Sequence, residues 1–133
     1  MFRPSPIQIA AGFAGRYFAR SILERLGYRV GTARNAEEAL RFVRDGHELN
    51  LLLIDVVLPS MNGVTLADRI VAERPGVRVL FMSGLTSQSG VPDKSVRGEP
   101  CGFLLKPFSL DVLARSVREL LDRGPERSQS LVS

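Results

Sequence analysis

Apolar residues along the chain fall into two patterns that alternate. Short apolar runs bounded by glycine, proline or asparagine predict strands, whereas apolar residues that recur every three or four positions predict helices. Strands are expected over residues 6–11, 28–33, 51–58, 77–82 and 102–105. Helices are expected between them, and Asn35 and Ser109 are residue types that favour the first position of a helix.

Strands that alternate with helices predict a parallel sheet with right-handed crossovers. We therefore expect an α/β fold, a flavodoxin-like doubly wound five-stranded parallel sheet of order 2-1-3-4-5 with helices on both faces. Residues 85–100 are rich in serine, glycine and proline, so helix four should be short or irregular, around Asp93 to Arg97. One domain is expected over residues 1–122, and the polar tail 123–133 is expected to be disordered.

Composition narrows the class of protein. The chain of 133 residues has a single cysteine, Cys101, and a single histidine, His47, which excludes a disulfide framework and a Cys/His zinc site. No apolar run approaches the roughly 18 residues that a membrane span needs, and the first residues lack a signal-peptide core. A soluble, cytoplasmic protein with no membrane contact is expected.

The chain is basic, with a net charge of +4 and a pI near 10.0. Its arginines are scattered singly along several predicted helices and are not interleaved with aromatic residues. This pattern favours a solvated surface over a nucleic-acid interface, so no nucleic-acid partner is expected.

Three polar residues stand out because each lies at or near the carboxyl end of a predicted strand. Asp55 interrupts the apolar run 51–58, which has the composition of a strand buried on both faces. Taken alone, Asp55 could equally be a site residue or a turn-forming cap. Ser83 and Lys106 end the next two strands, and parallel strands bring their carboxyl ends to one edge of the sheet. A shared site at that edge is therefore predicted.

With the Pro-x-x-x-Gly turn after Asp55, this set resembles the receiver domain of two-component response regulators, from about Pro6 to Asp122. The resemblance implies that Asp55 accepts a phosphoryl group from a histidine kinase. It implies that Lys106 pairs with the phosphoryl oxygens and that the Ser83 hydroxyl donates to one of them. It also places Phe103 at an aromatic switch position and makes the Lys106–Pro107 peptide bond cis.

The sequence departs from this family at its magnesium site. The family holds magnesium with an acidic pair after the first strand, and the matching positions are Ala10 and Ala11. No aspartate or glutamate precedes Glu24. Only Asp55 and the Val57 carbonyl remain as ligands, so magnesium binding should be weak or absent, and Lys106 should pair directly with Asp55. No cofactor is expected to bind tightly, and magnesium would bind only if Asp55 is a working phosphoacceptor.

Two functions remain open. The first is an atypical, stand-alone receiver that signals through protein–protein contacts without depending on phosphorylation. The alternative is a genuine phosphoacceptor that takes a phosphoryl group on Asp55. An Asp-nucleophile phosphohydrolase is set aside because Val57 stands where that class has a second aspartate. The chain is thus not expected to be an enzyme. The resemblance implies a histidine kinase or another two-component protein as partner, and a homodimer through the face from strand four to helix five.

Overall fold

The computed structural model describes residues 8–12, 16–58, 61–84 and 90–123. The strands are β1 (Gln8–Gly12), β2 (Arg29–Thr32), β3 (Leu51–Asp55), β4 (Arg78–Ser83), β5 (Ser95–Val96) and β6 (Glu99–Leu105). The helices are α1 (Arg16–Arg25), α2 (Ala36–Arg44), α3 (Gly63–Glu73) and α4 (Leu110–Asp122).

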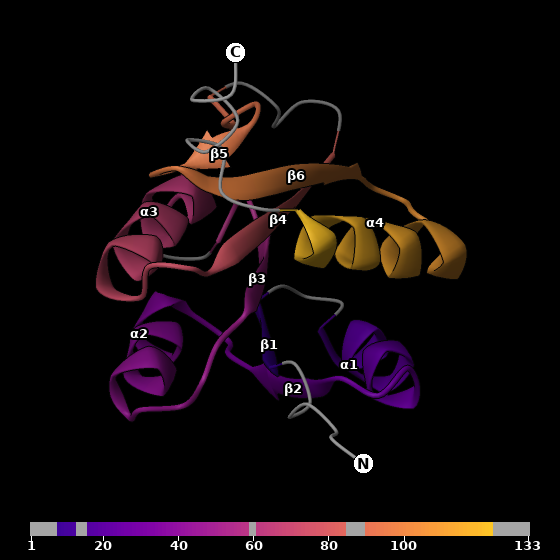
Figure 1. Ribbon diagram of the computed structural model, residues 1–133, viewed down its shortest axis with the longest axis horizontal. Helices are drawn as coiled ribbons and strands as arrows, with labels where there is room; N and C mark the ends of the chain where they lie inside the picture. The colour runs from indigo at the N-terminus through magenta and orange to yellow at the C-terminus, as the bar shows by residue number, and fades with distance from the viewer. Residues whose placement is uncertain (1–7, 13–15, 59–60, 85–89, 124–133) are drawn as a thin grey trace.

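The strands form one sheet in the order β2-β1-β3-β4-β6-β5. All neighbouring pairs are parallel except β5 and β6, which are antiparallel. Helices α2 and α3 cover one face of the sheet, and α1 and α4 cover the other (Figure 1). The predicted α/β class with helices on both faces is confirmed.

The predicted strand number is wrong, and so is the predicted helix around Asp93 to Arg97. The described part of that segment forms β5 and a two-residue turn into β6, which makes the sheet mixed and six-stranded. Arg97 and Gly98 occupy this turn with φ angles of 51° and 86°. Positive φ at both central residues defines the tight turn that suits antiparallel strands, and it cannot be part of a right-handed helix.

The sheet separates two apolar clusters. One lies under α2 and α3 and includes buried residues such as Ile54, Ile70 and Phe81. The other lies under α1 and α4 and includes Leu23, Leu80 and Leu113. Strand β3 contributes alternate residues to both clusters, which explains why its run is apolar without interruption.

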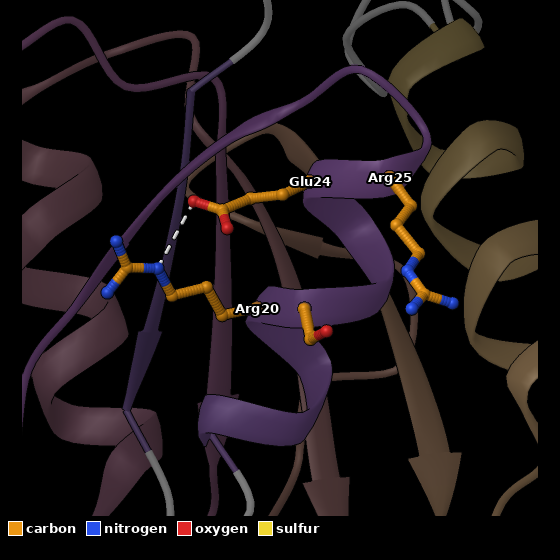
Figure 2. Close-up of a pocket in the computed structure, with 4 residues that line it drawn as sticks. Arg20, Glu24 and Arg25 are labelled. Atoms are coloured by element: carbon orange, nitrogen blue, oxygen red, sulfur yellow. Dashed lines mark hydrogen bonds and ion pairs between the residues drawn. The ribbon is translucent and has the colours of Figure 1, made fainter.

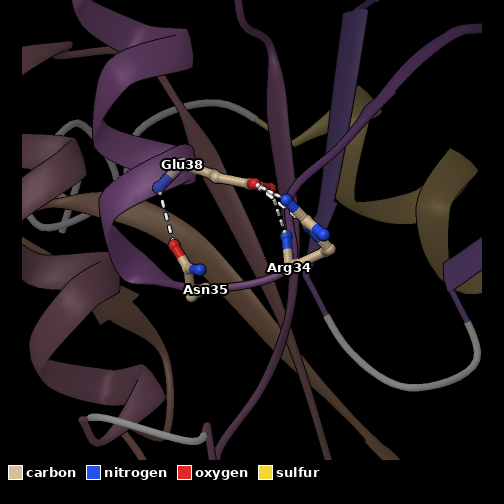
Figure 3. Close-up of polar contacts among 3 residues, drawn as sticks. All are labelled: Arg34, Asn35 and Glu38. Carbon is tan, nitrogen blue, oxygen red and sulfur yellow. Dashed lines mark hydrogen bonds and ion pairs between the residues drawn. The ribbon is translucent and has the colours of Figure 1, made fainter.

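The helix starts carry the capping residues that the sequence predicts. The Asn35 side chain accepts a hydrogen bond from the Glu38 amide (2.9 Å), and the Ser109 hydroxyl accepts one from the Val112 amide (3.2 Å). Beside the first of these caps, Arg34 donates through its backbone and its guanidinium to the Glu38 carboxylate (Figure 3). This contact lowers the pKa of the Glu38 carboxyl.

Candidate functional site

The three polar residues predicted to share a site do reach the same edge of the sheet. Asp55 is the last residue of β3, Ser83 is the last residue of β4, and Lys106 directly follows β6. The Lys106 amide donates to the Ser83 carbonyl (2.8 Å), which extends the ladder between β4 and β6 to this point. Backbone pairing between β4 and β6 therefore fixes the position of the Lys106 backbone at this edge.

An ion pair between Asp55 and Lys106 is the centre of this edge. The Lys106 ammonium donates to Asp55 Oδ2, so the predicted direct contact is present. The Asp55 side chain is only 13% exposed, whereas that of Lys106 is 37% exposed. The Val57 amide lies 3.4 Å from Asp55 Oδ1 and donates to it. Both carboxylate oxygens thus have a donor.

The side chains of Ser83 and Phe103 make contacts other than this ion pair. The Ser83 hydroxyl is 1% exposed and donates to the Gly84 carbonyl (3.0 Å), so its single proton is not directed at Asp55. Phe103 is partly buried on β6 and packs against the cluster under α2 and α3. The Lys106–Pro107 peptide bond is cis.

The first residue of α3, Gly63, lies directly against the backbone at the end of β3. The Gly63 amide donates to the Val56 carbonyl (2.6 Å), and Asn62 caps α3 through the Val64 amide (2.7 Å). A side chain on Gly63 would place its Cβ 2.0 Å from the Asp55 carbonyl oxygen. Only glycine allows α3 to begin this close to the site, a requirement that the turn sequence did not reveal.

Strand β1 contains Ala10 and Ala11, the two positions predicted to replace an acidic pair. In the register of the sheet, Ala10 and Ala11 lie level with Leu52 and Leu53 of β3. Their side chains lie outside what the structure describes. Among the described residues, no three histidine, cysteine, aspartate or glutamate side chains come together as metal ligands would.

A separate hollow lies on α1 and is lined by Arg20, Ser21, Glu24 and Arg25. Arg20 and Glu24 form an ion pair of 3.1 Å across it, and Arg25 points away from that pair (Figure 2). Both members of the pair are 45% exposed. This is an ordinary pair on a helix surface, and it contains none of the predicted site residues.

The family model of the response regulator receiver domain matches residues 14–118. The chain therefore belongs to the response regulator receiver domain family. It is 36% identical over 106 residues to the sensor kinase CckA of Brucella abortus, covering 76% of this chain. It is 30% identical over 106 residues to the response regulator receiver protein CpdR of the same organism, covering 80% of this chain and 87% of CpdR.

Solved structures give the same family. A CheY-like receiver domain protein from Methanospirillum hungatei matches with a TM-score of 0.73 and 26% identity, over 89% of this chain and 95% of that one. The receiver domain of the hybrid histidine kinase CckA matches with a TM-score of 0.70 and 27% identity, over 86% and 99%.

Relatives differ in how much of their length this chain spans. It covers 11% of CckA from Brucella abortus and 20% of the DNA-binding transcriptional regulator NtrC from Azospirillum brasilense. The activities of those whole proteins therefore cannot be assigned to this chain from family membership alone. The helices in the described ranges include none that is long and apolar enough to cross a bilayer.

Proposed function

We propose that this receiver is a signalling module that acts through protein–protein contacts, with Asp55 at the phosphoacceptor position beside a depleted magnesium site. Its partners are a histidine kinase or another two-component protein, and its output does not depend on magnesium-assisted phosphorylation. The observation that carries this proposal is the ion pair between Asp55 and Lys106. The Lys106 ammonium occupies the position beside the Asp55 carboxylate that a magnesium ion would need.

The donor set at this edge does not suit magnesium. Magnesium prefers oxygen ligands and is usually held through one or two carboxylates. No aspartate or glutamate precedes Glu24, so none can come from β1 or from the residues between β1 and α1. Asp55 is the carboxylate that remains, and its oxygens already accept from Lys106 and Val57. A magnesium ion would have to displace the lysine while gaining few other protein ligands.

The same pair makes Asp55 a poor nucleophile. Attack on a phosphoryl group needs an electron pair on a carboxylate oxygen, and a lysine bound to that oxygen must first move. In this proposal, Lys106 orients Asp55, and Ser83 and Phe103 are retained structural parts of the former switch. The proposed homodimer through the face from β4 to α4 is one contact that such a module could use.

A second function has its own support. Asp55, Ser83 and Lys106 meet at one edge as they do in a phosphoacceptor site, and CpdR, of which the chain covers 87%, is a response regulator receiver protein. Under this alternative, Lys106 exchanges the carboxylate for phosphoryl oxygens, and Asp55 accepts the group from a histidine kinase.

The test is phosphorylation in vitro followed by intact-mass measurement. The protein is incubated with acetyl phosphate or phosphoramidate, with and without magnesium. The proposal predicts no magnesium-dependent gain of a phosphoryl group. A stoichiometric gain that needs magnesium and is lost in Asp55→Asn would establish the alternative. A receiver with an intact acidic pair, labelled in parallel, shows that the phosphodonor is active.

A further inference from the structure

Glu99, the first residue of β6, carries a carboxylate in the interior of the protein. The residue is 7% exposed, and no lysine or arginine of the described ranges forms an ion pair with it. Burying a carboxylate costs free energy unless hydrogen bonds replace its water. The Gly76 amide donates to Glu99 Oε2 (3.0 Å). Glu99 is therefore held to the turn between α3 and β4, at the edge of the sheet opposite to Asp55.

The turn that Glu99 holds has an arginine at each end, and each arginine binds the end of a different helix. The Arg74 guanidinium donates to the Val43 carbonyl in the last turn of α2 (2.7 Å). The Arg78 guanidinium donates through Nε and Nη2 to the Arg123 carbonyl at the end of α4 (3.1 and 2.6 Å). The last carbonyls of a helix carry partial negative charge and lack helical partners, so an arginine there stabilises the helix end.

These two helix ends lie on opposite faces of the sheet, because α2 covers one face and α4 covers the other (Figure 1). The turn leads from α3 on the first face into β4, so its first arginine reaches α2 and its last reaches α4. Gly76 lies midway between them with a φ angle of 102°. Its amide donates to Glu99, and its carbonyl accepts from Arg78 Nη1 (3.4 Å). Holding Gly76 therefore holds the turn from which both arginines extend.

Glu99 also belongs to the hairpin of β5 and β6. Val96 of β5 pairs with Glu99 across the hairpin and is buried in the cluster under α2 and α3. Arg97, in the turn of the hairpin, forms an ion pair with Asp68 of α3 (2.9 Å), but both side chains are half-exposed. Exposed ion pairs contribute little to stability. The buried hydrogen bond of Glu99 is therefore the stronger of these two side-chain contacts between the hairpin and the segment from α3 to β4.

We propose that Glu99 is a latch that couples the hairpin of β5 and β6 to the ends of α2 and α4 through the turn at residues 74–78. While Glu99 holds Gly76, the turn keeps both arginines on their helix ends. When the hairpin moves and this bond breaks, both ends loosen together, on opposite faces of the sheet. Such coupling is reciprocal, so a partner that orders either helix end also fixes the hairpin. This inference goes beyond the proposed function and does not involve Asp55 or Lys106.

The test is hydrogen exchange of single backbone amides in the full chain labelled with ¹⁵N. Two amides report on the helix ends, Gly46 after α2 and Arg123 after α4, and each donates to a carbonyl of the last helical turn (3.3 Å). Glu99→Met removes the acceptor, so exchange of the Gly76 amide should rise roughly ten- to hundredfold, the worth of a hydrogen bond to a charged group. Exchange at both helix ends should rise roughly two- to fivefold, the worth of a cation at a helix end.

The same replacement at the two arginines separates the two branches of the coupling. Arg74→Met should speed exchange at the end of α2 alone, and Arg78→Met should speed exchange at the end of α4 alone. Glu99→Met, in contrast, should speed exchange at both. Arg115→Met, on an exposed position of α4, is the control and should change neither end. The Lys106 amide, at the opposite edge of the sheet, should exchange as in the parent in all four variants, which separates local loosening from a loss of overall stability.

A second variant keeps the test decisive if Glu99→Met does not fold. Glu99→Gln retains an acceptor without the charge, so exchange should rise in the same pattern, by less than about tenfold at Gly76. Faster exchange at Gly76 with both helix ends unchanged would overturn the proposal, because the turn would then move without loosening the helices. Faster exchange at only one helix end, or an equal rise at every amide including Lys106, would also overturn it. Unchanged exchange at Gly76 would show that Glu99 does not hold the turn.

Discussion

Gly63 is where the site is most sensitive to a small change. In Gly63→Ala, the new Cβ would lie 2.0 Å from the Asp55 carbonyl oxygen, 3.0 Å from its carbonyl carbon and 3.1 Å from the Val56 Cα. All three atoms belong to the backbone of β3 and the residue after it, so no side chain can rotate to relieve the contact. The start of α3 must move away from β3 instead.

The expected cost follows from these distances. Opening the contact from 2.0 Å to an ordinary separation requires a shift of more than about 1 Å. Overpacking against rigid surroundings costs about 3 kcal/mol at the upper end of its usual range. Alanine restricts the unfolded chain and returns about 0.4–1 kcal/mol. The net loss of unfolding free energy is therefore about 2 kcal/mol, or roughly 6–10 °C in Tm for a chain of this length.

The measurement is thermal and urea unfolding followed by circular dichroism. Gly84→Ala is the matched control, because Gly84 follows β4 at the same edge and a Cβ there meets nothing within 4 Å. Its stability should change by less than about 0.5 kcal/mol. Equal midpoints for the two variants would refute the close approach of α3 to Asp55.

Three further substitutions or conditions test other parts of the structure. Ser109→Ala should lower the unfolding free energy by about 1 kcal/mol in urea, because it removes the cap of α4. Arg97→Gln breaks a bidentate pair with Asp68 whose members are 54% and 49% exposed, so the loss should be at most about 1 kcal/mol and should shrink in salt. The pKa of Glu38 is lowered from 4.5 by Arg34, so the stability it contributes is present above pH 4.5 and lost as pH falls through the lowered value. Melting curves of the parent and Glu38→Gln should converge below that pH.

Each of these three predictions can be contradicted by a specific result. Arg115→Gln, on an exposed position of α4, is the matched control for Arg97→Gln, and equal losses in the two would show that the pair with Asp68 contributes nothing. A Ser109→Ala variant as stable as the parent would place the start of α4 elsewhere. A Glu38→Gln variant whose difference from the parent persists at low pH would show that its effect is not ionic.

Much of the fold could be predicted because its signals are local. The long apolar run of β3 and the caps at Asn35 and Ser109 each fix one element from a few adjacent residues. The hairpin of β5 and β6 was missed because its strands are short and its turn is Arg97–Gly98. An asparagine or aspartate before the glycine would have been the usual signal for this turn.

The candidate site likewise has some features that the sequence predicts and others that it does not. Asp55, Ser83 and Lys106 could be brought together from the sequence, because parallel strands must end at one edge. The contact of Gly63 with the Asp55 carbonyl could not be predicted from the sequence, since it depends on how closely a helix approaches a strand after a turn.

The turn at Arg97 and Gly98 also fixes the register in which β6 pairs with β5. A strand that slips by one residue turns every side chain to the opposite face. Strand β5 is joined to β6 by only two residues, whereas β4 and β6 are separated by a long connection. Short hairpins close within microseconds, before distant parallel strands meet. A hairpin that closed one residue out of register would turn the Lys106 side chain to the opposite face of the sheet, away from Asp55.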